Sequence, residues 1–293
     1  MASPCPTAYL NGSFLPTAEA RVSILDRGFQ FADGVYEVIP VYGGRPFRLD
    51  EHLRRLERSM AEIQLPAPLS RQAFADTAAE LIRHNQGTEC QIYIQVTRGE
   101  APRNHPFPDA VHPTVVMTCT PRDPVPSEWI EEGVSVITVE DFRWDRCDIK
   151  SIALLPNVMM RQRATEAGAM EALWVHDVEV MEGAASNVFA VIDGEARTPP
   201  DGPRVLPGIT RDVVLELARA HGWPVSTAPI PVGELGEAEE VWITSSTKEV
   251  LPVTRVDGHL VGSGKPGPLF RTVLAGYRDH IQRFRNGEEG GPV

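Results

Sequence analysis

The stretch RWDRCDIKS, residues 143–151, contains Lys150, one of only three lysines among the 293 residues of the chain. The other two are Lys248 and Lys265, so nearly all of the 28 basic residues are arginines. Lys150 precedes the apolar run SIALLP (151–156). An amine beside apolar side chains can lose its proton at neutral pH, whereas a guanidinium stays charged, so this position suits a Schiff-base or general-base lysine. A solvated lysine at a strand end is the alternative, and scarcity alone does not separate Lys150 from the other two.

The composition is that of an ordinary globular protein with an acidic surplus. Hydrophobic residues make up 42% and charged residues 23% of the chain, and the formal net charge is -12. A protein that binds the phosphate backbone of a nucleic acid needs a basic surface, so this charge argues against one. It does not exclude a small anion held by a few arginines. The length suggests one large domain or two ordinary ones.

The cysteines point to a reducing compartment. Cys5, Cys90, Cys119 and Cys147 are widely spaced, with no CxxC pair and no neighbouring histidine cluster. This spacing predicts neither a structural zinc site nor a disulfide framework. The start of the chain has no signal-peptide pattern, and no apolar run reaches 18 residues. We therefore expect a cytoplasmic protein without a metal.

The order of hairpins and helices predicts the fold class. Hairpin turns are expected at Asn11-Gly12, Gly43-Gly44, Asp193-Gly194 and Asp257-Gly258. Amphipathic helices are expected from Asp50, which would be the N-cap, and over 209–221, ended by Gly222. Strands joined mostly by hairpins, with helices in blocks, favour an α+β protein. The segment PRDPVPSE (121–128) is predicted to link an N-terminal domain, 1–120, to a C-terminal domain, 129–293.

Four further features could bind a ligand, although each has a purely structural explanation. In EGAASN (182–187), Glu182 lies among small residues that let a flat ligand approach, or it is a solvated turn residue. LPGITR (206–211) opens a helix whose N–H groups could bind phosphate, or Thr210 simply caps it. TSSTK (244–248) is a hydroxyl-rich turn. Arg55 lies one step from the apolar stripe of its helix and could face phosphate or solvent.

Eight blocks, in order along nearly the whole chain, carry a family resemblance. They are DRGFQFADGVYEV (26–38), EHLRRL (51–56), QVTRGEAPRNHPFP (95–108), RWDRCDIKS (143–151), EGAASNVF (182–189), GITRDVV (208–214), ITSSTKEVLPV (243–253) and GSGKPGP (262–268). With these blocks the chain resembles the fold-type IV pyridoxal-phosphate aminotransferases, and within them it is most similar to the D-amino acid transaminases. The implied fold has a small N-terminal α/β domain and a larger C-terminal β-barrel-like domain with helices.

The resemblance implies a homodimer that binds pyridoxal 5′-phosphate (PLP), with a role for each matching residue. Lys150 would form a Schiff base with the cofactor and move the proton during the reaction. Glu182 would keep the ring nitrogen protonated, and Leu206 would pack against the ring. The other cofactor-binding residues, chiefly around the phosphate, would be Arg55, Ile209, Thr210, Ser245 and Ser246. The substrate carboxylate would be held by Tyr36 together with Arg103 and His105, these two contributed by the second subunit.

The motif PRNH (102–105) decides the subfamily within this resemblance, because a guanidinium binds a carboxylate with two parallel hydrogen bonds. An ordinary polar loop is the alternative explanation of the motif. The implied reaction moves an amino group from a D-amino acid, such as D-alanine or D-glutamate, to a 2-oxo acid, such as 2-oxoglutarate or pyruvate, by a ping-pong mechanism.

Several alternatives of the same fold stay open at this point. They are an (R)-selective amine transaminase, a branched-chain aminotransferase, an aminodeoxychorismate lyase and a PLP-binding protein without turnover. The chain also departs from the D-amino acid transaminases at three positions. Ala184 and Ala185 stand where those enzymes carry serines, and Lys248 is unexpected in its turn. These departures bear on the range of substrates rather than on PLP chemistry.

Overall fold

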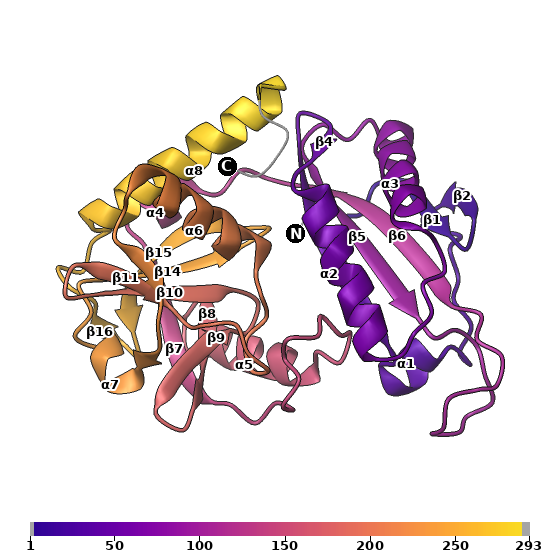
Figure 1. The fold of residues 1–293 in the computed structure, drawn as a ribbon, viewed down its shortest axis with the longest axis horizontal. Helices are drawn as coiled ribbons and strands as arrows, with labels where there is room; N and C mark the ends of the chain where they lie inside the picture. The colour runs from indigo at the N-terminus through magenta and orange to yellow at the C-terminus, as the bar shows by residue number, and fades with distance from the viewer. Residues whose placement is uncertain (1–2, 289–293) are drawn as a thin grey trace. The chain divides into compact units, whose positions relative to one another are not determined.

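The computed structural model describes residues 3–288, in which the chain forms two compact units (Figure 1). Unit 1 contains residues 3–123, Ile149–Ala153 and Phe284–Asn286. Unit 2 contains Pro124–Asp148, Leu154–Arg283 and residues 287–288. The segment around Lys150 therefore packs with unit 1, although it follows the first strand of unit 2 along the chain. The linker over 121–128 and the domain limits on either side of it stay a prediction.

Unit 1 is an antiparallel sheet with helices packed against it. The strand order is β2-β1-β6-β5-β3-β4. The strands are β1 (Thr7–Leu10), β2 (Ser13–Pro16), β3 (Gly34–Tyr42), β4 (Arg45–Pro46), β5 (Cys90–Thr97) and β6 (Thr114–Pro121). The helices are α1 (Arg27–Phe31), α2 (Leu49–Glu62) and α3 (Arg71–Asn85). Helix α2 contacts β3, and α3 contacts β1 and β6. Leu53, Leu56 and Met60 of α2 join the buried side chains of β5 in one core.

Unit 2 is a mixed half-barrel sheet with its own helices. The strand order is β12-β11-β10-β14-β15-β7-β8-β9-β13, and β16 pairs with β15. The strands are β7 (Val134–Glu140), β8 (Glu171–His176), β9 (Glu179–Gly183), β10 (Asn187–Ile192), β11 (Glu195–Thr198), β12 (Val225–Thr227), β13 (Ile230–Pro231), β14 (Glu240–Ser245), β15 (Glu249–Val256) and β16 (His259–Leu260). The helices are α4 (Ser127–Glu131), α5 (Leu155–Glu166), α6 (Ile209–His221), α7 (Val232–Leu235) and α8 (Pro268–Asn286), of which the last three residues belong to unit 1.

The α+β prediction is confirmed, and the four predicted hairpin turns join the strands as expected. The predicted cap of α2 is wrong. The helix begins at Leu49 with Arg48 at the N-cap, so Asp50 lies inside the first turn, where its carboxylate still faces the positive end of the helix dipole. Helix α1 was not predicted. No helix within residues 3–288 has the length and apolar character needed to cross a membrane.

Gly34 at the start of β3 provides a test of this packing. A Cβ added there would lie 2.7 Å from the Val96 carbonyl oxygen and 3.0 Å from the Thr97 Cα, both backbone atoms of β5. Because backbone atoms cannot rotate away, Gly34→Ala is expected to lower the free energy of unfolding by about 1–3 kcal/mol in a denaturant titration. Gly233→Ala, which meets no atom within 4 Å, is the control. Equal stability of the two variants would contradict this packing.

Candidate active site

Main-chain hydrogen bonds fix Lys150 at the start of β3. The Tyr36 amide donates to the Lys150 carbonyl oxygen at 3.0 Å, and the Ile152 amide donates to the Gly34 carbonyl oxygen at 3.1 Å. The Lys150 amide donates to Ser59 Oγ of α2 at 3.2 Å. Lys150 Nζ lies 4.4 Å from the centre of the Tyr36 ring, a cation–π contact. The structure thus brings together two of the predicted residues, Lys150 and Tyr36.

A buried carboxylate holds the third predicted residue of unit 1, Arg55. His52, Arg55 and Ser59 share one face of α2 because they are three and four residues apart. Arg55 donates to Glu37 of β3 through Nε at 2.7 Å and Nη2 at 2.9 Å, and the Nδ1 of His52 lies 2.7 Å from the same carboxylate. Glu37 is completely buried and Arg55 is 8% exposed. Arg55 therefore faces into the unit rather than toward solvent.

The charges of this cluster shift two pKa values. Burial would raise the pKa of Glu37, but the charge of Arg55 and the hydrogen bonds from Arg55 and His52 outweigh it and hold the pKa well below its usual range. Burial lowers the pKa of His52, and although Glu37 opposes this shift, Arg55 and Lys150 add to it. His52 is therefore neutral at pH 7 and donates through Nδ1. Its buried Nε2 has no hydrogen-bond partner within the described residues.

In unit 2, Glu182 at the end of β9 is a buried carboxylate paired with arginine. Arg143 Nη1 donates to Glu182 Oε1 at 2.6 Å, and the Leu206 amide donates to Oε2 at 2.9 Å. Arg143 also makes two hydrogen bonds to Asp141, at 2.9 Å each, and stacks over Trp174. Burial would lower the pKa of Arg143, but Asp141 and Glu182 raise it overall. Glu182 is thus a fixed carboxylate and not a solvated turn residue.

The chain from Leu206 to Thr210 forms an open helix start. Asn187 Nδ2 donates to the Leu206 carbonyl oxygen at 2.9 Å, so both sides of Leu206 are held. A Cβ on Gly208 would lie 1.8 Å from Asn187 Oδ1, so any side chain at the N-cap of α6 would displace the Asn187 side chain that holds Leu206. Gly208 supplies no side-chain cap, and Ile209 and Thr210 begin the helix. Uncapped N–H groups and the positive end of the dipole favour an anion there.

The turn after β14 contains the predicted hydroxyl groups and one that was missed. Ser245 Oγ accepts from the Lys248 amide at 3.1 Å and so closes the turn, while Ser246 is partly exposed. Thr244, which pairs with Asn187 in the sheet, has a buried Oγ1 without a hydrogen-bond partner in the described part of the chain. A bound acceptor would satisfy it.

Lys248 has a structural explanation. Its Nζ lies 3.8 Å from Glu171 Oε2, and Arg161 lies 3.4 Å from the other oxygen of this fully buried carboxylate. Burial lowers the pKa of Lys248, although Glu171 opposes the shift. Lys150, in contrast, has no ion pair with a carboxylate anywhere in residues 3–288. The two scarce lysines therefore occupy different environments.

Arg103 and His105 lie in the loop between β5 and β6 of unit 1, and both are exposed. Their side chains contact Phe31 of α1: the Arg103 guanidinium is 5.1 Å from its ring centre and the His105 ring is 5.5 Å away. Neither makes a hydrogen bond or ion pair with Tyr36 or Lys150 in the described chain. Within one chain, these predicted residues are not brought to the amine.

These groups have the chemistry that a phosphate-bearing carbonyl cofactor needs. Within residues 3–288, unit 1 contains Lys150, an amine without an acidic partner. Unit 2 contains the fixed buried carboxylate Glu182, and its Thr244 hydroxyl and the open start of α6 can bind an anion. No group of three or more His, Cys, Asp or Glu side chains within residues 3–288 could hold a metal ion.

Comparison with known proteins gives the family. Residues 34–256 match the family model for amino-transferase class IV, and the chain belongs to this family. It is 44% identical to D-alanine aminotransferase of Bacillus licheniformis over 271 residues, covering 92% of this chain and 95% of that protein. It is 40% identical to D-alanine aminotransferase of Staphylococcus haemolyticus, covering 94% and 97%. The chain is therefore an aminotransferase that acts on amino acids and 2-oxo acids.

Solved structures agree with the family. The branched-chain amino acid aminotransferase of Escherichia coli superposes with a TM-score of 0.87 at 26% identity, over 98% of this chain and 96% of that one. The T.th. branched-chain amino acid aminotransferase, solved with pyridoxamine 5′-phosphate, gives the same TM-score and identity over 97% and 95%. Class IV aminotransferases depend on PLP.

Four residues that lie beside the predicted site residues were not predicted from the sequence. Glu37 and His52 lie in the blocks at 26–38 and 51–56, and Arg143 opens the block at 143–151. Their position within the family blocks could have drawn attention to these residues from the sequence. Only the fold shows which carboxylate is paired with which basic side chain. Thr244 begins the TSSTK segment, in which only Ser245 and Ser246 were predicted to bind the cofactor.

His52 makes stability depend on pH. In the unfolded chain it takes up a proton below about pH 6.5, whereas the folded protein keeps it neutral to lower pH. The unfolded state then binds more protons, so the free energy of unfolding falls as pH decreases through this window. His52→Gln is expected to make the fall between about pH 7 and pH 5 shallower in denaturant titrations. His84→Gln, at a side chain 46% exposed, is the control. An unchanged slope in His52→Gln would refute the assignment.

Proposed function

We propose that this enzyme transfers the amino group of a D-amino acid, such as D-alanine or D-glutamate, to a 2-oxo acid, such as 2-oxoglutarate or pyruvate, by a ping-pong mechanism. The observation that carries the proposal is the 44% identity to a D-alanine aminotransferase over 92% of the chain. The structural neighbours named for branched-chain amino acids are only 26% identical. The PRNH motif at 102–105 supports the same substrate class, because its arginine suits a carboxylate.

The cofactor in this proposal is PLP, which when bound supplies an aldehyde that reacts with amines and a ring that withdraws electrons. Lys150 Nζ would be the attachment point and the group that moves the proton at the substrate α-carbon. Glu182, fixed by Arg143, would keep the ring nitrogen protonated. Leu206, whose peptide is held on both sides, would pack against the ring.

The phosphate is bound by groups that the fold prepares for an anion. Arg55 is oriented by its two hydrogen bonds to Glu37. Ile209 and Thr210 offer N–H groups at the uncapped start of α6. The turn after β14 adds Ser245, which is already used within the turn, and Ser246.

The substrate carboxylate is bound by Tyr36 and by Arg103 and His105, which we place in the active site of the second subunit of a homodimer. Within one chain these two side chains contact Phe31 and not Tyr36, which agrees with a role in a neighbouring subunit. Ala184 and Ala185 offer no hydroxyl group to this substrate. We further propose that the enzyme works in the cytoplasm.

Borohydride reduction tests the attachment point. Reduction of the cofactor-loaded enzyme is expected to fix the cofactor on Lys150, because this amine has no carboxylate partner within residues 3–288, whereas Lys248 is paired with Glu171. Peptide mapping by mass spectrometry identifies the labelled lysine. Lys248→Arg is the control variant and should still be labelled at Lys150. A label on Lys248 in the unmodified protein would overturn the assignment.

A panel of amino donors tests the reaction. The absorbance of the bound cofactor is expected to change on mixing with D-alanine or D-glutamate and not with L-leucine or (R)-1-phenylethylamine. A response to L-leucine alone would indicate a branched-chain aminotransferase, and a response to the amine alone an (R)-selective amine transaminase. Pyruvate release from aminodeoxychorismate without an amino acceptor would indicate a lyase. No response to any donor would indicate a PLP-binding protein without turnover.

A further inference from the structure

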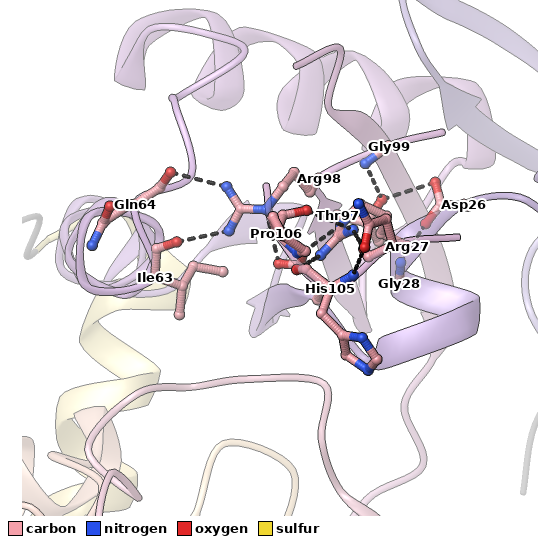
Figure 2. Close-up of polar contacts among 12 residues, drawn as sticks. Asp26, Arg27, Gly28, Ile63, Gln64, Thr97, Arg98, Gly99, His105 and Pro106 are labelled. Atoms are coloured by element: carbon pink, nitrogen blue, oxygen red, sulfur yellow. Dashed lines mark hydrogen bonds and ion pairs between the residues drawn. The ribbon is translucent and has the colours of Figure 1, made fainter. Parts of the chain in front are cut away.

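A single buried arginine holds the main chain of the loop that carries Arg103 and His105 (Figure 2). Arg27 of α1 donates through Nη1 to the carbonyl oxygens of Asn104, at 2.6 Å, and Pro106, at 3.4 Å. Its Nη2 donates to the carbonyl oxygen of His105 at 3.2 Å. Three consecutive carbonyl groups of an exposed loop thus converge on one guanidinium that is only 4% exposed.

Asp33 connects this guanidinium to a second buried arginine. Its carboxylate accepts from Arg27 Nε at 2.7 Å and from Arg98 Nε at 2.9 Å. Arg98 in turn donates to the carbonyl oxygens of Ile63 and Gln64, at 2.7 and 3.0 Å, just after the end of α2 (Figure 2). Arg27, Asp33 and Arg98 carry one surplus positive charge, which the main-chain carbonyl groups stabilise. Since a buried charge without partners is costly, these carbonyl groups are held facing inward.

The backbone of Arg27 is also anchored to the start of the loop. Asp26 accepts from the Gly28 amide at 2.7 Å and from the hydroxyl groups of Thr97 and Thr114 at 2.9 and 2.7 Å. The Arg27 amide donates to the Gly99 carbonyl oxygen at 2.9 Å. Helix α1 is therefore tied to the ends of both strands that flank the loop. The backbone position of Arg27, and with it the start of its side chain, is therefore fixed by these hydrogen bonds.

We propose that Arg27 is a positioning residue that sets the affinity for the substrate carboxylate by holding the loop main chain at residues 104–106. With these carbonyl groups turned toward Arg27, the side chains of Arg103 and His105 contact Phe31, whose ring centre also lies 4.9 Å from the Arg27 guanidinium. Arg27 does not touch the substrate. This inference rests on the proposed function, because it needs Arg103 and His105 to bind the carboxylate.

The geometry requires arginine at this position. A planar guanidinium presents five N–H donors in a fixed arrangement, so it can bind Asp33 and three carbonyl groups together. A lysine ammonium keeps the charge but has three donors around one atom and cannot reach all four acceptors. A glutamine lacks both the donor geometry and the charge. The expected order of carboxylate affinity is therefore arginine, then lysine, then glutamine.

Steady-state kinetics with D-alanine test the proposal on the cofactor-loaded enzyme. Because small displacements of a binding group weaken binding strongly, Arg27→Gln is expected to raise KM by about 10-fold with kcat changed by less than about threefold. Arg27→Lys should be intermediate. Arg45→Gln is the control, since Arg45 also donates to a carbonyl group, that of Phe284, away from the loop. An unchanged KM in Arg27→Gln overturns the proposal, and if that variant does not fold, an unchanged KM in Arg27→Lys does so.

A double-mutant cycle separates positioning from general destabilisation. If Arg27 acts through Arg103, then Arg27→Gln should have little further effect on KM in an Arg103→Gln background. Equal fold-changes in both backgrounds would show that Arg27 does not act through the loop arginine and would overturn the proposal.

Limited proteolysis gives a readout that does not need activity. Trypsin is expected to cleave the Arg103–Asn104 bond faster in Arg27→Gln than in the unmodified enzyme or in Arg45→Gln, followed by mass spectrometry. Unchanged cleavage would contradict the holding of the loop. If the unmodified enzyme and Arg45→Gln do not use D-alanine at all, the proposed function fails, and the cleavage rates still decide whether Arg27 holds the loop.

Discussion

The pairing of the Lys150 segment with the first residues of β3 is the constraint on which the amine side of the site depends. Two main-chain hydrogen bonds, from Tyr36 to Lys150 and from Ile152 to Gly34, attach five residues from the middle of the sequence to the sheet of unit 1. Because the strand direction then fixes where each side chain points, the amine of Lys150 lies beside the Tyr36 ring. Gly34 itself has no room for a side chain, because the backbone of β5 lies close on its other side and Ile152 of the Lys150 segment lies 3.1 Å from the added Cβ.

Buried carboxylates with cationic partners recur around the candidate groups. Glu37 is held by Arg55 and His52, Glu182 by Arg143, and Glu171 by Arg161 and Lys248. Replacing one partner of such a pair leaves a charge without compensation, whereas replacing both by apolar residues is often neutral for stability. Stability alone therefore does not explain why these pairs are ionic. For Arg55 and Glu182, the binding of a charged cofactor that we propose would give such a reason, because fixed charges can orient a charged ligand.

Much of the fold could be predicted from local patterns, whereas the candidate site residues were assigned from the order of the sequence blocks and stay a prediction. Turn dipeptides such as Asn11-Gly12 encode their own backbone geometry, so hairpins could be predicted without tertiary information. The start of α2 could not, because Arg48 caps it in a left-handed conformation that its sequence does not favour. Likewise Arg55 was ambiguous between phosphate and solvent, since its burial depends on Glu37, 18 residues away. Long-range charge pairs of this kind leave no periodic signal.

Arg103 could be predicted from the sequence as a candidate binding residue, whereas the role of Arg27 could not. Arg103 stands in a short motif with an obvious chemical use. Arg27 is separated from its three acceptors by 77 to 79 positions, and those acceptors are main-chain carbonyl groups, which every residue has. With alanine at 184 and 185, hydroxyl groups that could share the binding of a substrate are missing. If the loop binds the substrate carboxylate as we propose, the selectivity for a carboxylate depends more heavily on the loop, and in our inference Arg27 sets the orientation of the loop without touching the substrate.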